Sequence, residues 1–201
     1  MTSDKEERRG RGRPKKWRRA EVLGQVTEHY WREGVHALSL NEVCRRVSVS
    51  KPSIYRDFGG EDGLIEAVLG YYRDAVVTIV LDALKLELPF SEVMELLIVG
   101  MTTPREHPPG CLFTEMRTLR SRLGPQTLVK LEEIEAERVI AFEQWYERAL
   151  KRGEVTLSLS PAEASRYIDA QFTLLLIHMG MGRTADEVRA EARLALSVLT
   201  L

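Results

Sequence analysis

Apolar residues in this 201-residue chain recur at intervals of three and four positions, and strand-like alternation is nearly absent. This spacing gathers apolar side chains on one face of a helix, so it predicts helices almost throughout. Glycine, proline and capping residues divide the pattern into nine helices, at residues 17–33, 40–47, 51–58, 61–87, 91–103, 111–122, 125–152, 161–180 and 185–199. The one segment with strand character, 154–160, has no candidate partner strand. The sequence therefore predicts an all-α fold.

Three helix starts carry a recognisable local signal. A hydroxyl residue is followed three positions later by glutamate at Ser39 and Glu42, at Ser160 and Glu163, and at Thr184 and Glu187. In this capping box the hydroxyl oxygen accepts a free backbone N–H of the first turn, and the carboxylate accepts the N–H of the capping residue. We expect a helix to begin directly after each of the three hydroxyl residues.

Residues 39–58, SLNEVCRRVSVSKPSIYRDF, have the pattern of two short helices joined by a tight turn. This is the outline of a helix-turn-helix, whose second helix enters the major groove of DNA. On that helix Ile54 and Phe58 share one face and Arg56 lies nearly opposite, where it can contact a guanine edge or a phosphate. On spacing alone, a solvated corner of a helical bundle is the alternative. The candidate DNA contacts here are Ser39, Ser50, Lys51, Pro52, Ser53, Tyr55 and Arg56.

Charge is distributed unevenly along the chain. Residues 1–58 hold fourteen Lys and Arg against eight Asp and Glu, a net charge of +6, whereas residues 59–201 hold fifteen against twenty-two, a net charge of -7. The segment RGRGRPKKWRR, at 9–19, is typical of an extended arm that lies in a narrow minor groove beside a helix-turn-helix. Its candidate DNA contacts are Arg11, Arg13, Lys15 and Lys16. The alternative is a tail that only adds positive charge.

The stretch from Val22 to Leu64 resembles the N-terminal domain of the tetracycline-repressor (TetR) family of bacterial regulators. The matching positions are Tyr30 and Gly34 at the end of the first helix, Ser39 at the start of the second, Val49 and Ser50 at the turn, Tyr55 and Phe58 in the recognition helix, and Leu64 at the start of the fourth. The resemblance implies an all-helical homodimer that binds a palindromic double-stranded DNA operator and releases it when a small-molecule effector binds. It also implies three parts: a basic arm at 1–16, a DNA-binding domain at 17–64, and an effector-binding and dimerisation domain at 65–201.

Three positions depart from the family pattern. Ser48 stands where the family usually has glycine, so a left-handed turn at this residue would be strained. Asp57 occupies a position that is often aromatic or histidine, and Glu61 occupies that of a lysine that commonly meets a phosphate. Both carboxylates place negative charge near DNA, so we expect the arm to supply much of the salt-dependent affinity.

The remaining helices must provide both a pocket and a dimer interface. The segment 172–181 is apolar almost all round and must be covered on every side, which favours a four-helix interface with a second copy. The interface candidates are Ile168, Leu175, Met179, Val188, Ala192 and Leu196. Large adaptable side chains near the Pro-Pro-Gly break at 108–110 are the pocket candidates: Met94, His107, Phe113, Met116, Phe142, Trp145 and Phe172. Both sets also suit an ordinary core, and Trp17 and Trp31 are expected to be packing anchors.

Other classes of protein find little support. Cys44 and Cys111 are too few for a disulfide framework and have no zinc-ligand spacing, so we expect no metal, no cofactor and a cytoplasmic location. The charged N-terminus lacks a secretion signal, and the apolar run at 172–181 is half of what a membrane span needs, so we expect no membrane association. His107 and Cys111 lack a third catalytic group, and no enzyme is expected. The alternative function is an architectural protein that coats A·T-rich DNA through its arm; a helical enzyme with a fused DNA module is a third.

Overall fold

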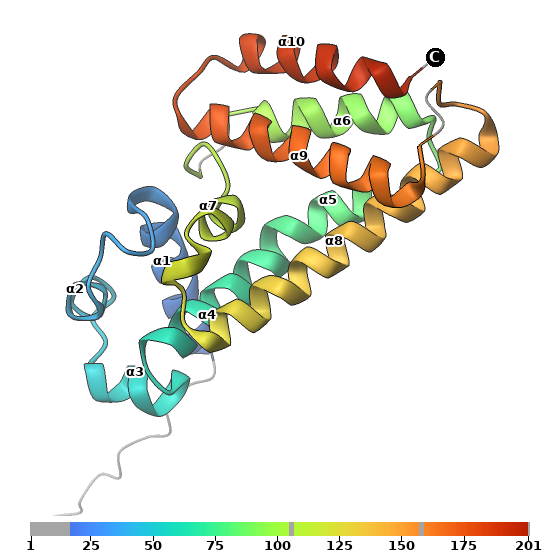
Figure 1. The fold of residues 1–201 in the computed structure, drawn as a ribbon. Helices are drawn as coiled ribbons and strands as arrows, with labels where there is room; N and C mark the ends of the chain where they lie inside the picture. Colours follow the sequence, from blue (N-terminus) through green and yellow to red (C-terminus); the bar gives the residue numbers. More distant parts are fainter. Residues whose placement is uncertain (1–16, 105–106, 157–158, 201) are drawn as a thin grey trace, which may run out of the picture.

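The computed structural model describes residues 17–104, 107–156 and 159–200. These residues form an all-helical fold, as the sequence predicts, with a small group of helices at one end of a larger helical body (Figure 1). The small group consists of α1 (Trp17–Glu33), α2 (Leu40–Arg46) and α3 (Lys51–Phe58). Their predicted bounds are confirmed to within one residue.

Two long helical runs lead from the small group into the body (Figure 1). One is α8 (Pro125–Arg152), which is continuous, as predicted. The other begins with α4 (Glu61–Tyr72), passes through a five-residue π-helical turn, η1 (Arg73–Val77), and ends with α5 (Thr78–Ala83). The helix predicted over about 61–87 is present as this run, but it ends at Ala83 and contains the π turn, which changes the backbone hydrogen-bond register without an evident change in apolar spacing.

The other helices complete the body. They are α6 (Phe90–Thr102), α7 (Leu112–Thr118), η2 (Arg120–Arg122), α9 (Pro161–Gly180), α10 (Ala185–Leu196) and η3 (Ser197–Leu199). In Figure 1, α6, α9 and α10 form a layer beside α5 and α8, while α7 lies between this layer and the small group. The body therefore consists of helices packed in two layers, with α7 as the bridge to α1.

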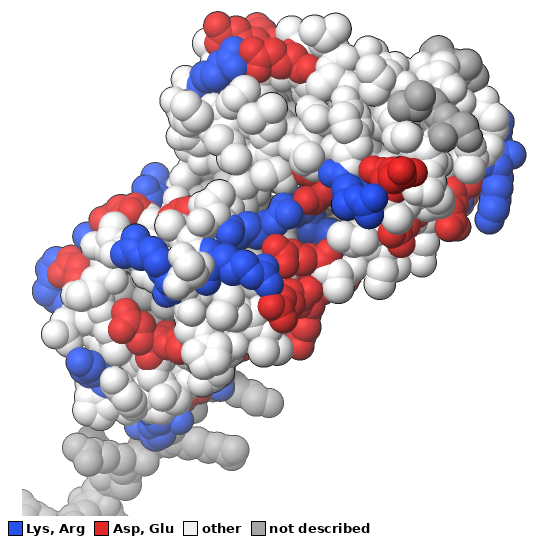
Figure 2. Space-filling model, in the orientation of Figure 1, with Lys and Arg blue, Asp and Glu red and all other residues white. Residues whose placement is uncertain are grey.

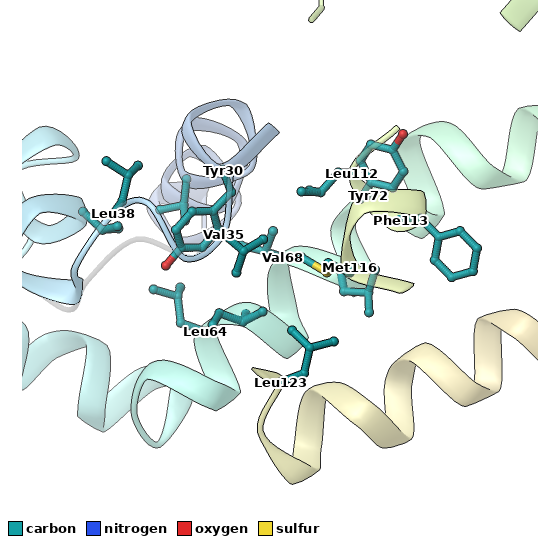
Figure 3. Packing of buried hydrophobic residues seen from close by; sticks show 14 of the residues in the cluster. Tyr30, Val35, Leu38, Leu64, Val68, Tyr72, Leu112, Phe113, Met116 and Leu123 are labelled. Atoms are coloured by element: carbon teal, nitrogen blue, oxygen red, sulfur yellow. The ribbon is translucent and has the colours of Figure 1, made fainter. Parts of the chain in front are cut away.

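Two clusters of buried apolar side chains hold these helices together. The first joins α1, α2 and α3 to α4, α7 and the first half of α8. Figure 3 shows part of it, with Tyr30 of α1, Leu64 and Val68 of α4 and Met116 of α7 lying close together. The second cluster joins α5, α6, α9 and α10 to the second half of α8. The small group thus has no core of its own, and its position depends on α4 and α7.

The capping predictions are confirmed at two of three helix starts. Ser160 and Thr184 form complete capping boxes with the glutamates three residues later. At Ser39 only half of the motif forms, since its Oγ accepts the Glu42 N–H at 3.3 Å. The Glu42 carboxylate instead accepts hydrogen bonds from Arg45 and Arg46, at 2.9 and 2.7 Å to their Nε atoms. The predicted box at Ser39 was wrong, because two neighbouring guanidinium groups compete for the carboxylate.

The segment with strand character does not join a sheet in the part of the chain that the structure describes. Val155 makes a single antiparallel bridge with Thr200. Thr156 adds hydrogen bonds from its Oγ1 to the carbonyl oxygens of Val198 and Thr200, at 3.0 and 3.2 Å. The segment therefore fastens the end of the chain to the body.

Candidate nucleic-acid interface and ligand cavity

The outer face of α3 carries the polar residues of the helix-turn-helix. Ile54 is fully buried and Phe58 is half-buried, so these two side chains fix α3 to the body. On the other side the Tyr55 residue is 53% exposed and the Arg56 side chain 62% exposed. Lys51 and Pro52 are also exposed, and Ser53 is partly exposed. The structure therefore brings five of the predicted contacts to one surface.

Ser39 and Ser50 lie at the starts of α2 and α3, where both act as helix caps. Ser50 Oγ accepts the backbone N–H of Ser53 at 3.3 Å and lies 2.9 Å from Ser53 Oγ. Both capping residues are exposed, so each presents a helix N-terminus to solvent. Such ends favour anions because backbone N–H groups and the helix dipole point outward. The four predicted arm contacts, Arg11, Arg13, Lys15 and Lys16, lie outside the described residues.

The neighbouring Asp57 restrains the guanidinium group of Arg56. Arg56 Nε and Nη2 donate to the two carboxylate oxygens of Asp57, at 2.9 and 3.1 Å. These hydrogen bonds lower the pKa of Asp57, so its negative charge persists at neutral pH. A nucleic acid that contacts Arg56 must therefore compete with a carboxylate of the same chain. Asp57, which departs from the family pattern, is thus expected to weaken the contact between Arg56 and DNA.

The turn between α2 and α3 contains the predicted backbone strain. Ser48 has a φ of 53°, and it is the one non-glycine residue with a positive φ in the described ranges. A side chain in this left-handed region clashes with the following carbonyl group, which costs about 1–2 kcal/mol. The turn keeps its shape through backbone hydrogen bonds such as Val49 N–H to Cys44 O at 3.0 Å.

Close contacts fix α3 and α4 to each other and to α8. A Cβ atom on Gly63 would lie 1.8 Å from the carbonyl oxygen of Phe58, so only glycine permits this approach. One residue earlier, the Asp62 carboxylate accepts the backbone N–H groups of Gln126 and Thr127, at 2.9 and 3.1 Å, and the Thr127 hydroxyl at 2.7 Å. Burial opposes ionisation of Asp62, but these hydrogen bonds outweigh it and lower its pKa. Asp62 therefore caps α8 from α4.

A cavity of about 200 Å³ lies between the two apolar clusters. Its wall combines α1, the α4–η1–α5 run, α6, α8 and α9 with the segment that leads into α7. The lining residues are Trp31, Tyr72, Val76, Val77, Ile79, Val80, Ala83, Leu96, Leu97, Gly100, Met101, Thr103, Gly110, Cys111, Phe113, Arg138 and Leu176. A mostly apolar lining with a few polar groups is typical of small-molecule sites.

The polar groups of the cavity gather around Arg138, which is buried and only 6% exposed. Its Nη2 donates to the Asp169 carboxylate at 2.8 Å, and its guanidinium carbon lies 4.9 Å from the centre of the Phe113 ring. Nearby, the Tyr72 hydroxyl donates to Cys111 Sγ at 3.2 Å. Burial lowers the pKa of Arg138, because a charge is poorly solvated inside the protein.

The predicted pocket residues lie in different places. Phe113 lines the cavity. His107 is exposed and stacks on Trp31, with ring centroids 5.2 Å apart. The other five are buried in the two cores and are not part of the lining: Met94, Met116, Phe142, Trp145 and Phe172. Figure 3 shows Met116 packed near Val68 and Leu123.

Sequence reasoning missed most of the cavity lining, including the polar residues Trp31, Tyr72 and Arg138. Trp31, which it treats as a packing anchor, lines the cavity and packs edge-on against Tyr72, with ring centroids 5.0 Å apart. Arg138 had a detectable signal, because it interrupts the apolar stripe of α8 between Ile134 and Phe142. A single charged residue in a buried stripe is unusual and often marks a functional position.

The predicted dimer contacts on α9 and α10 are mostly part of the chain's own core. Met179 is partly buried, and the other five are buried: Ile168, Leu175, Val188, Ala192 and Leu196. Other apolar side chains in this part of the chain are exposed: Leu174 on α9, Met181 just after it, Leu194 on α10 and Val198 in η3. Figure 2 shows few charged side chains over α9 and mixed charges along α8.

Among the described residues, no group of three or more His, Cys, Asp or Glu side chains is arranged to hold a metal ion. Cys44 and Cys111 are both free, the former buried and the latter partly buried. None of the helices in the described ranges is both long and apolar enough to cross a membrane.

Comparison with known proteins identifies relatives of the helix-turn-helix. Residues 27–68 match the family described as bacterial regulatory proteins, tetR family. The HTH-type transcriptional repressor ComR of Escherichia coli is 33% identical over 67 residues, which are 33% of this chain and 32% of ComR. The HTH-type transcriptional activator FasR of Mycolicibacterium smegmatis is 36% identical over 78 residues, 39% of this chain and 36% of FasR. The matched region spans about a third of either relative.

The whole fold is shared with solved structures of regulators. A cysteine mutant of the TetR family transcriptional regulator CifR, in complex with 26 bp of double-stranded operator DNA, superposes with a TM-score of 0.75. The alignment covers 94% of this chain and 100% of that one, at 19% sequence identity. The resemblance of the helix-turn-helix region to the TetR family is thus confirmed by the family match, and the solved structure shares the fold.

Proposed function

We propose that this chain, whose helix-turn-helix is that of the tetR family of bacterial regulatory proteins, is a DNA-binding transcriptional regulator that responds to a small molecule. The outer face of α3 carries the proposal. Arg56 and Tyr55 are exposed there, while Ile54 beneath them is fully buried and keeps the helix in place. A fixed helix with exposed polar side chains suits a major groove, where a guanidinium group can bind a guanine edge.

The proposed regulator acts as a homodimer through α9 and α10. These helices and the residues that follow them carry an exposed apolar surface, with Met181 73% and Leu194 76% exposed; its members are Leu174, Met181, Leu194 and Val198. A twofold partner would cover the same side chains on both copies, because such an interface is self-complementary. The buried candidates on these helices would then support the interface from within each chain. Two copies of α3 would occupy successive major grooves, roughly 34–36 Å apart, on a palindromic operator.

The effector is proposed to bind in the cavity beside Arg138 and to release the operator, and the protein is proposed to act as a repressor. A ligand shifts a conformational equilibrium only by binding one state more tightly than the other. The cavity supports this mechanism, because its wall includes both α1 and the η1 turn that leads from α4 into the body. The matched relatives include one named repressor and one named activator, so the direction of control is tested separately, with a reporter gene.

A comparison of Arg56→Ala with Arg152→Ala tests DNA recognition. Arg152 is a matched control because it is also an ion-paired arginine, bound to Glu154 at 2.9 Å, but lies at the far end of α8 (Figure 1). Operators are first selected from random DNA with the wild-type protein, and affinities are then measured by electrophoretic shift. We expect Arg56→Ala to lose roughly 10-fold or more of its preference for the selected site, which corresponds to one good base contact.

The same experiment separates the regulator from the architectural alternative. Unchanged sequence preference in Arg56→Ala, with dimerisation intact, would refute recognition through α3. Selection of broad A·T-rich sequences without a palindrome would favour an architectural protein that binds through the arm. Palindromic sites and a loss confined to Arg56→Ala would support the regulator.

A further inference from the structure

The cavity joins the DNA-binding end of the molecule to the body. Trp31 belongs to α1, whereas Arg138 belongs to α8 and Leu97 to α6, and all three line the same space. The η1 turn supplies Val76 and Val77 to the wall. A molecule in this cavity therefore touches α1 directly as well as the helices around it. The chemistry of the cavity determines which kind of molecule that is.

The cavity has an apolar entrance and a polar inner end. Ile79 and Leu96 line it and are 52% and 45% exposed, so apolar side chains form its outer rim. Tyr72 and Arg138 are buried members of the lining and mark its inner end. The volume of about 200 Å³ is below the roughly 300–1,000 Å³ of common ligand pockets, which limits the occupant to a small molecule. An occupant that fits both ends has an apolar body and one polar head group.

The charge at the inner end specifies the head group. Arg138 is the one basic residue in the described lining, which contains no Lys, Asp or Glu. Its partner Asp169 is shared, because Arg117 also binds that carboxylate at 2.9 Å. Two guanidinium groups thus meet at one partly buried carboxylate, and Arg117 also binds Glu135 at 3.1 Å. Because the lining presents this guanidinium group and no carboxylate, it would attract a negative head group and repel an ammonium group.

Trp31 provides a second reason to expect a hydrogen-bond acceptor on the head group of the ligand. Its Nε1 atom is buried and has no hydrogen-bond partner among the described residues, although the ring packs against Tyr72 and His107. A buried N–H group without an acceptor is unfavourable, so native structures rarely leave one unpaired. A ligand oxygen would supply the missing acceptor on a residue that already lines the cavity.

We propose that the cavity binds a small amphipathic monocarboxylate, whose carboxylate lies against Arg138 and accepts the Trp31 N–H, and whose apolar body extends toward Ile79 and Leu96. Trp31 then transmits binding to α1, because the ligand is bonded directly to the helix that precedes the helix-turn-helix. This inference rests on the proposed function, since it names the chemical class of the effector and the residue that couples it to DNA binding.

Three probes of equal chain length test the head group: octanoate, octylamine and octan-1-ol. Their binding to the full-length protein is measured by isothermal titration calorimetry. We expect octanoate to bind about tenfold more tightly than octylamine, with octan-1-ol between them, because only the carboxylate combines a hydrogen bond to Arg138 with the opposite charge. Equal affinity for octanoate and octylamine, or no binding of octanoate, would overturn the proposal.

Two tryptophan variants test the position of the ligand. Trp31→Phe removes the N–H group and keeps an aromatic ring in the wall. Trp145→Phe makes the same change at a buried tryptophan in the second core, whose Nε1 is also without a partner among the described residues. We expect about a fivefold loss of octanoate affinity in Trp31→Phe and wild-type affinity in Trp145→Phe. The reverse pattern would place the ligand in the second core and refute the assignment.

Operator affinity at saturating octanoate tests the coupling. It should fall about fivefold or more in wild type and in Trp145→Phe, and change by less than about twofold in Trp31→Phe. An equal response in all three proteins would refute the role of Trp31. The outcomes also separate this inference from the proposed function: a protein that binds its operator but not octanoate refutes the carboxylate alone, and one that binds octanoate but no DNA refutes the regulator alone.

Discussion

The backbone of Gly63 in α4 lies so close to that of Phe58 in α3 that a single added methyl group should disrupt the packing of these two helices. Substitution of Gly63 by alanine places a Cβ atom 1.8 Å from the carbonyl oxygen of Phe58 and 3.0 Å from its carbonyl carbon, where ordinary contact begins at 3.4 Å. The obstacle is backbone, so it cannot rotate away as a flexible side chain would. Relief requires α3 to move away from α4, and overpacking of this kind typically costs about 1–3 kcal/mol.

Gly70 on the same helix is a matched control, because a Cβ atom there would meet nothing within 4 Å. Gly70→Ala should raise the free energy of unfolding by about 0.4–1 kcal/mol, since alanine loses less backbone entropy than glycine in a helix. For a chain of this size, 1 kcal/mol corresponds to a shift of about 2–4 °C in Tm. Chemical and thermal unfolding of both variants should give opposite signs, and Gly63→Ala should also bind operator DNA more weakly. If Gly63→Ala were as stable as Gly70→Ala, the close approach of α3 and α4 would be refuted.

Four further predictions concern the turn, the recognition helix, the α8 cap and the arm. Ser48→Gly should raise the free energy of unfolding by about 1 kcal/mol in urea titrations, because it removes the strain of a φ of 53°; an unchanged or lower value would contradict this. Asp57→Asn should tighten operator binding roughly two- to fivefold at low salt, measured by fluorescence anisotropy, because it releases Arg56 and removes a negative charge. Asp62→Ala should lower the free energy of unfolding by about 1–2 kcal/mol at pH 7. The pKa of Asp62 is lowered in the folded state, so the difference in stability between wild type and Asp62→Ala should persist above about pH 4 and shrink as the pH falls below it. A difference independent of pH would exclude capping of α8 by the Asp62 carboxylate. Deletion of residues 1–16 should flatten the dependence of operator affinity on salt, since the slope counts neutralised phosphates, and an unchanged slope would assign the arm no contact with DNA.

The helix positions are well predicted because their causes are local. The apolar spacing that marks α1, α8 and α9 repeats within one or two turns, and the capping residues Ser160 and Thr184 act within three residues. The outward position of Arg56 follows from the same periodicity. The interruption at η1 was missed, because a π turn depends on which carbonyl each N–H selects.

The ligand cavity was predicted less well, because it depends on distant segments. Side-chain size and helical spacing indicate which residues of a helix are buried, but they do not indicate which buried residues border an empty space. Phe113 lines the cavity, whereas Met116, one turn later, is packed in the first core. Trp31 and Arg138 are 107 positions apart in the sequence and line the cavity together only because α1 and α8 are assembled on the same long helical run.

The sequence by itself determined the helices, the helix-turn-helix, the strained serine at its turn and the polarity of the recognition face. These features depend on residues within a few positions of one another, so the order of the residues specifies them. The tertiary structure alone decided that Gly63 lies against Phe58, that Asp62 caps α8, and that a polar cavity forms at the junction of the two cores. Each of these results from close packing between distant segments, where the shape of the gap depends on all the surrounding side chains together.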